Sequence, residues 1–122
     1  MAKTFAMLVG WVLVIVGILN FFHTPVFDVN LLPTHGVVHI VAGLLGIWAA
    51  KDHARGYAMW VGVVGILLGL LGLVTKDVLG LVNLPTWITV VHFVLGAWGL
   101  WTYMSSKQSI PSGPPMSQMP PV

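Results

Sequence analysis

The chain has 122 residues, of which 57% are hydrophobic and 7% are charged, and it contains no cysteine. With a mean hydropathy of +0.95 it has too few polar side chains to cover a water-facing surface, so a soluble globular domain is excluded. Its net charge of +2 rests on five scattered Lys and Arg residues, which excludes nucleic-acid binding. The absence of cysteine excludes disulfides, thiolate metal sites, iron–sulfur clusters and covalently attached haem.

Four apolar stretches follow one another along the chain, each long enough to cross about 30 Å of hydrocarbon. Their continuous apolar character predicts helices rather than the alternating strands of a membrane barrel. The first stretch has no small-residue cleavage site after it, so we expect a retained helix rather than a signal peptide. The predicted fold is all-α, a four-helix transmembrane bundle in residues 1–104, with spans at about 5–22, 32–50, 57–75 and 85–104.

The positive charges predict the orientation, because short loops rich in Lys and Arg stay on the cytoplasmic side. Four of the five lie at the amino end, between the second and third stretches and in the tail, whereas Lys76 lies on the other side. We therefore expect both termini in the cytoplasm and the chain in the bacterial inner (plasma) membrane. Residues 105–122 are rich in Pro and Ser, so we expect a cytoplasmic tail that is disordered unless a partner binds it.

The second half of the chain repeats a pattern from the first half. Residues 30–34 read Asn-Leu-Leu-Pro-Thr and return as Asn-Leu-Pro-Thr in residues 83–86. Each copy is followed by the pattern H-x-x-x-G-x-x-G-x-W, which starts at His39 and at His92. The repeat predicts two tandem helical hairpins related by a pseudo-two-fold axis along the membrane normal. The proline of each copy should start a helix, with Asn or Thr capping the free amides.

Glycines recur at steps of three and four residues within the apolar stretches. In lipid, helices associate through close packing of small residues, so these stripes predict the contact faces between helices. A mean step near 3.5 residues predicts left-handed, nearly parallel packing. The glycines assigned to helix packing are Gly10, Gly17, Gly43, Gly46, Gly62, Gly65, Gly69, Gly72, Gly96 and Gly99.

His39 and His92 are the principal candidate site residues, because an ionisable side chain within a span is costly and usually faces the bundle interior or a cavity. They lie at matching depth, and His35, one turn before His39, shares its face. One interpretation is structural, with neutral imidazoles hydrogen-bonded to each other, to another polar side chain or to a buried water. The other is cofactor binding, either haem b held between His39 and His92 or another pigment, a quinone or a lipid.

The same three histidines could supply three nitrogens to zinc or copper. No carboxylate lies within the spans to support such a site, so the sequence analysis assigns no metal site. No Ser-His-Asp, Cys-His or paired-carboxylate set can be assembled, and we predict no enzyme.

The doubled pattern over residues 30–48 and 83–101 resembles that of small four-span bacterial membrane proteins grouped as a domain of unknown function. The resemblance covers nearly the whole chain except the tail. It implies a four-helix inner-membrane protein and implies no particular activity.

The function expected from the sequence is that of a structural or accessory subunit of a larger membrane assembly. The glycine stripes, the lipid-facing apolar surfaces and the proline-rich tail favour this interpretation. It predicts a lipid bilayer around the chain and either a membrane protein partner or a homo-oligomer. The alternatives are a haem-, pigment- or quinone-binding redox protein that uses the intramembrane histidines, and a small channel or transporter subunit.

Overall fold

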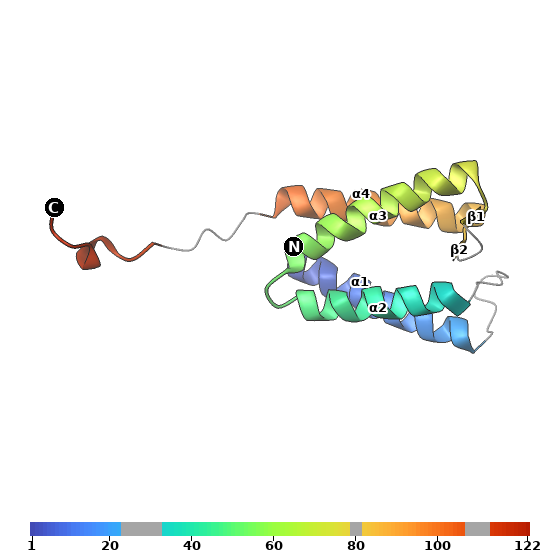
Figure 1. Cartoon of the computed structure of the whole chain (residues 1–122), viewed down its shortest axis with the longest axis horizontal. Coiled ribbons are helices and arrows are strands. Elements are labelled where there is room, and N and C mark those ends of the chain that lie inside the picture. Colours follow the sequence, from blue (N-terminus) through green and yellow to red (C-terminus); the bar gives the residue numbers. More distant parts are fainter. Residues whose placement is uncertain (23–32, 79–81, 107–112) are drawn as a thin grey trace.

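The computed structural model describes residues 1–22, 33–78, 82–106 and 113–122. Four long helices dominate it (Figure 1): α1 (Ala2–Phe21), α2 (Pro33–Ala49), α3 (Ala54–Val74) and α4 (Thr86–Ser105). Between α3 and α4, two-residue strands β1 (Asp77–Val78) and β2 (Val82–Asn83) pair antiparallel, with Asp77 opposite Asn83. A short 3-10 turn, η1 (Met116–Gln118), lies in the tail. The expected all-helical architecture is confirmed, with this small strand pair as an addition.

Three of the four helices are long and apolar enough to cross a membrane, namely α1, α3 and α4. The α2 helix is also apolar, but its 17 residues span only about 25 Å. The predicted second span begins at residue 32, which lies outside the described residues. Large apolar side chains such as Val12, Leu67 and Val94 are exposed on the outside of the bundle, as expected for a surface in contact with lipid.

The prolines of the repeated segments mark the starts of two helices. The α2 helix begins at Pro33, and Pro85 is the N-cap residue of α4. The expected side-chain cap is wrong for α4, since no side chain caps its free amides. The first intrahelical bond runs from the Thr89 amide to the Pro85 carbonyl at 3.0 Å, and the Thr89 hydroxyl donates to the same oxygen at 3.2 Å. Pro85 is itself the N-cap residue, with a non-helical ψ of 159°, so α4 begins one residue after the proline.

The helices pack most extensively as an α1/α2 pair and an α3/α4 pair. In the first pair, a Cβ added to Gly43 would lie 2.5 Å from the carbonyl oxygen of Gly10. In the second, a Cβ added to Gly65 would lie 2.8 Å from the Cα atom of Gly96. An added Cβ at any of the ten glycines assigned to helix packing would come within 3.0 Å of a neighbouring atom. Backbones therefore approach each other directly within each pair.

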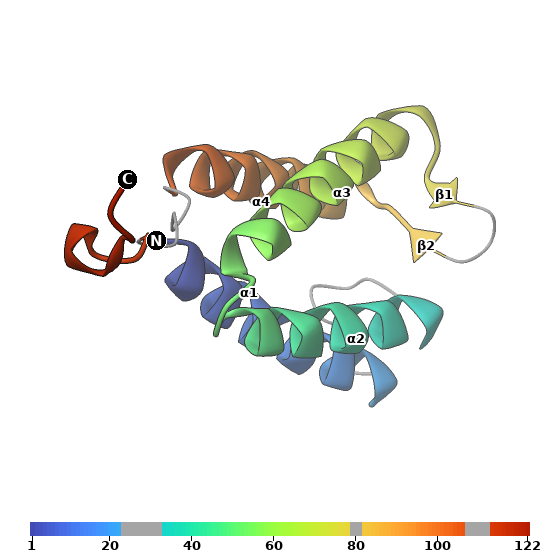
Figure 2. The ribbon, with the colours of Figure 1, turned by 60° about the vertical axis from the view of Figure 1, so that its left-hand side comes forward.

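The apolar contacts between the two pairs lie where α1 and α3 begin. Phe5 and Val9 of α1 form a buried cluster with Ala58 of α3, and the rings of Phe5 and of Trp98 in α4 are nearly perpendicular with centroids 4.9 Å apart. The Tyr57 hydroxyl of α3 donates to the Ala42 carbonyl of α2 at 3.0 Å. Figure 2 shows the ribbons of α1 and α3 closest near their first turns and farther apart toward the other end. We call that other end, where α1 and α3 end and α2 and α4 begin, the histidine end.

The described part of the tail, residues 113–122, extends away from the helices (Figure 1), and every residue in it is exposed. Its binding to a partner stays a prediction.

Candidate functional site

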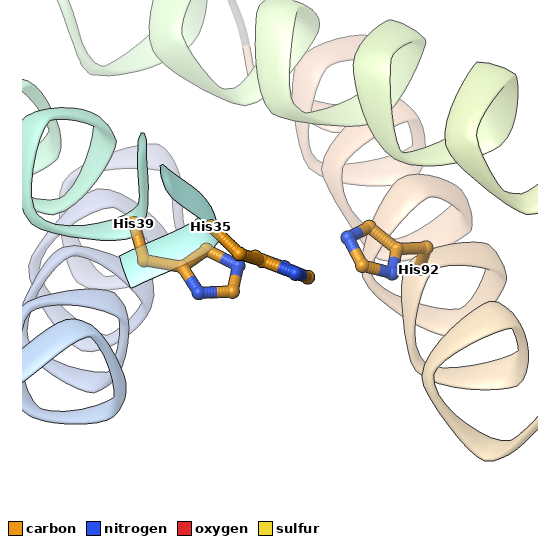
Figure 3. Close-up of side chains that lie close together, drawn as sticks. All are labelled: His35, His39 and His92. Carbon is orange, nitrogen blue, oxygen red and sulfur yellow. The ribbon is translucent and has the colours of Figure 1, made fainter. Parts of the chain in front are cut away.

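Three histidines from two helices meet at the histidine end of the bundle. His35 is the third residue of α2 and His39 lies one turn later, so both side chains leave the same face of that helix. His92 is the seventh residue of α4. Figure 3 shows the His35 side chain extending from α2 toward that of His92 on α4. The site therefore joins one helix of each helix pair.

The distances within this histidine cluster suit coordination of one ion. The ring centroids of His35 and His39 are 4.4 Å apart, and those of His35 and His92 are 6.3 Å apart. One ring nitrogen from each of the three residues lies within 4.8 Å of the other two. Nitrogens that share a tetrahedral zinc ion are about 3.3 Å apart, since each Zn–N bond is about 2.0–2.1 Å long. Small rotations of the side chains would therefore bring the three nitrogens to ligand positions.

Two ring nitrogens of the cluster are buried without a hydrogen-bond partner among the described residues. They are the Nδ1 atoms of His35 and His39. The His35 side chain is only 2% exposed, so water has little access to it. Because a buried polar atom without a partner costs about 1–3 kcal/mol, such atoms are rare and call for an explanation. A bound ion would remove this cost for each ring that rotates so that the lone pair of its unpartnered nitrogen points at the ion.

The His92 ring is already oriented for binding. Its Nδ1 lies 2.8 Å from the carbonyl oxygen of Ile88, one turn earlier in α4. A carbonyl oxygen can only accept, so Nδ1 carries the hydrogen and Nε2 keeps the free lone pair. Metal-binding histidines are held in this way by an outer hydrogen bond that selects the tautomer. The role of the Ile88 carbonyl was missed from the sequence, although its spacing of four residues from His92 is the available signal.

The glycine contacts explain why His92 faces the other helix pair. The carbonyl oxygen of His92 lies 2.8 Å from the position that a Cβ on Gly65 would occupy, so its backbone belongs to the α3/α4 contact. One turn later, Gly96 also packs directly on α3. The backbone of α4 at His92 packs on α3, and the His92 imidazole extends toward α2.

No carboxylate belongs to the cluster among the described residues. Asp52 lies in the connection between α2 and α3, and Asp77 lies in β1. The third acidic residue, Asp28, is outside the described residues. A positive ion bound by three neutral imidazoles would therefore keep its charge unless a further ligand supplied a negative one.

In the structure His35 joins the predicted pair of His39 and His92. The repeat pairs His39 with His92 because they occupy equivalent positions in its two copies. The ring of His35 lies 6.3 Å from that of His92, and one ring nitrogen from each of the three residues lies within 4.8 Å of the other two. The position of the repeat equivalent to His35 is occupied by Ile88, so the repeat by itself gives no signal for a third ligand.

The other two histidines lie elsewhere. His53 is in the connection between α2 and α3, at the opposite end of the bundle, and its ring stacks on Trp48 with centroids 5.1 Å apart. His23 lies outside the described residues.

Comparison with known proteins finds one family. The sequence profile of a family described as a domain of unknown function (DUF4383) matches residues 23–105, which include all three histidines of the cluster. No curated protein and no solved structure matches the chain.

Proposed function

The chain belongs to the DUF4383 family, whose description assigns no activity, and from the geometry of its own residues we propose that it is a membrane protein that binds a transition-metal ion. The ligands are His35, His39 and His92. The observation that carries the proposal is the convergence of three ring nitrogens within 4.8 Å of one another. The unpartnered Nδ1 atoms of His35 and His39 support it, because they leave this buried polar cluster unsatisfied without an ion.

The donor set favours zinc or copper. Imidazole nitrogen suits zinc, copper, nickel and iron, whereas calcium and magnesium prefer oxygen ligands. Three protein ligands leave a coordination position open for water or an anion. Because isolated charge is costly in an apolar environment, the site favours either monovalent copper or a divalent ion that carries an anionic fourth ligand.

Metal analysis of the purified protein tests the proposal. Protein made without a polyhistidine tag is incubated in detergent with Zn²⁺, or with Cu⁺ under reducing conditions, and is separated from free metal before the metal content is measured. We expect about one ion per chain in the wild type, and weaker binding, so that the ion is lost on separation from free metal, in His35→Ala, His39→Ala and His92→Ala. His53→Ala is the matched control and should keep it, because His53 lies outside the cluster. Wild-type protein without bound metal, or equal binding by all four variants, would contradict the proposal.

Haem b between His39 and His92 is the second candidate. A porphyrin needs a flat space between its two axial ligands, and the ring of His35 lies 4.4 Å from that of His39. The third imidazole therefore favours a single ion over a macrocycle. An absorbance spectrum distinguishes the two, since bound haem gives a Soret band and Zn²⁺ gives none. A Soret band lost in both His39→Ala and His92→Ala would establish the haem function instead.

We further propose the setting in which the site works. The protein lies in the bacterial inner membrane with both termini in the cytoplasm and serves as a subunit of a larger membrane assembly. Equivalent glycine contacts in the two helix pairs, at Gly10 with Gly43 and at Gly65 with Gly96, support the two-hairpin repeat. Single cysteines introduced at the ends of the helices report sidedness through their labelling from either side. Cross-linking in native membranes identifies a partner, and ion flux in proteoliposomes tests the alternative of a channel subunit.

A further inference from the structure

We infer that the metal ion is a bridge between the α1/α2 pair and the α3/α4 pair, so that ion binding controls how the two pairs are held at the histidine end. This inference rests on the proposed function and names its structural consequence. The ligands themselves are divided between the pairs, since His35 and His39 belong to α2 and His92 belongs to α4. One ion bound by all three joins elements that the chain connects only through the short turn between α2 and α3.

Each helix pair is held together without the ion. Within the α1/α2 pair, a Cβ on Gly17 would lie 2.7 Å from the Gly36 carbonyl oxygen, which is a direct backbone contact at the histidine end. Within the α3/α4 pair, Gly72 packs on the Thr89 side chain at the same end. Such contacts depend on close packing of small residues and are independent of any ligand.

The buried apolar clusters between the two pairs lie toward the end of the bundle opposite the histidines. Contacts within the pairs far exceed those between them. The buried apolar clusters that join the pairs contain Phe5, Val9 and Ala58 in one case and Ala6, Ala50 and Ala54 in the other, all at or near the opposite end. At the histidine end, the described contacts across the pairs include α2 with β2 and the ring of His35 with that of His92.

The chemistry of this contact makes it dependent on an ion. A buried imidazole with an unpartnered nitrogen adds desolvation cost to the interface, whereas coordination to a shared ion adds bonds across it. Free ion at concentrations above its dissociation constant therefore stabilises the arrangement with the three nitrogens together. Without the ion, the two pairs stay joined at the opposite end and are free to separate at the histidine end.

The variant His92→Ala separates binding from bridging. It leaves His35 and His39 one turn apart on α2, a two-ligand site within a single helix. We expect this variant to bind Zn²⁺ at least about tenfold more weakly, since loss of even an outer-shell partner costs 10- to 100-fold. At Zn²⁺ concentrations that fill the remaining site, the ion has no ligand on α4 and cannot join the pairs.

Distances between spin labels test the bridge in the full-length protein. The chain has no cysteine, so labels go only where cysteines are introduced. Ile18→Cys on α1 with Leu73→Cys on α3 measures the separation of the pairs at the histidine end, and both positions are exposed. Ile18→Cys with Val38→Cys on α2 is the matched control within one pair. Zn²⁺ is suitable because it is diamagnetic, and bound zinc is measured on the same samples.

We expect Zn²⁺ to narrow the Ile18–Leu73 distance distribution and to leave the Ile18–Val38 distribution unchanged. In His92→Ala neither distribution should change, although zinc still binds. His92→Gln provides the same test with a polar side chain that can donate to the Ile88 carbonyl, and an unchanged Ile18–Val38 distance shows that either variant is folded.

Two results would overturn the inference, and they differ from failure of the proposed function. If wild-type protein binds one Zn²⁺ and the Ile18–Leu73 distribution stays the same, the metal site is real and the bridge is wrong. If the Ile18–Leu73 distance distribution of His92→Ala narrows on zinc addition as that of the wild type does, the ion acts without a ligand on α4. The bridge is then wrong as well. Wild-type protein that binds neither Zn²⁺ nor Cu⁺ refutes the proposed function itself and the bridge with it.

Discussion

A methyl group added at Gly65 should weaken the α3/α4 contact and displace a metal ligand at the same time. The Cβ of Gly65→Ala would lie 2.8 Å from the Gly96 Cα atom, 2.8 Å from the His92 carbonyl oxygen and 2.9 Å from the Gly96 nitrogen. Ordinary contacts begin at 3.4 Å, so α4 must move away by about 0.5–0.6 Å. All three atoms belong to the backbone, and no change of rotamer can relieve the contact.

The matched control lies in the same helix. Gly56 has no atom within 4 Å of an added Cβ, so Gly56→Ala changes helix propensity without changing packing. Both substitutions replace glycine with a better helix former, a gain of up to about 1 kcal/mol in a helix interior, and the comparison removes much of this gain. Overpacking costs about 1–3 kcal/mol. We therefore expect Gly65→Ala to be less stable than Gly56→Ala by about 1–3 kcal/mol.

Reversible unfolding of the purified protein in mixed micelles, followed by circular dichroism as the share of denaturing detergent rises, measures this difference. Zinc binding by the same samples reports the second effect, because His92 moves with α4. We expect weaker binding in Gly65→Ala and unchanged binding in Gly56→Ala. Equal stability of the two variants within about 0.5 kcal/mol would refute the close backbone contact on which the packing argument depends.

Three further predictions concern the metal site and the hydrogen bond of Tyr57. Bound metal should be released on strong acidification, because a coordinating imidazole nitrogen must be unprotonated. Metal content after dialysis at steps from about pH 7.5 down to about pH 3 measures this, and a metal content that does not fall over this range would point to ligands other than histidine. Tyr57→Phe should lower the unfolding free energy by about 0.5–1.5 kcal/mol by removing the hydrogen bond to the Ala42 carbonyl, and Tyr103→Phe is the control. A chelator should lower the unfolding midpoint of metal-loaded wild-type protein but not that of His35→Ala, since only an ion bound to the native state stabilises it.

Structure is most predictable from this sequence where the physical constraint is local. The length of an apolar run measured against the thickness of the bilayer predicts a helix without knowledge of its neighbours, and α1, α3 and α4 confirm this. The proline before α4 correctly marked the start of that helix, but the expected side-chain cap was wrong. A cap depends on the direction in which one side chain points, which the residue type alone does not decide.

For the candidate site, the sequence predicted the three histidines, with His39 and His92 as the leading pair and His35 beside them. Repeat symmetry favoured His39 with His92, and the absence of a carboxylate argued against a metal site. The structure brings His35 to His92 and places all three nitrogens together. His35 has no counterpart in the second copy, where Ile88 stands, so an argument from symmetry could not find it.

The sequence by itself determined the apolar helices, the glycines at their contacts and the identity of the ionisable groups within them. Hydropathy and residue spacing along one helix are properties of the chain that need no partner. Only the tertiary structure decided which imidazoles meet, because that depends on the rotation of α2 and α4 about their own axes and on contacts between residues more than fifty positions apart. Those rotations are set by the glycine contacts within each helix pair, where a difference of one methyl group moves a whole backbone.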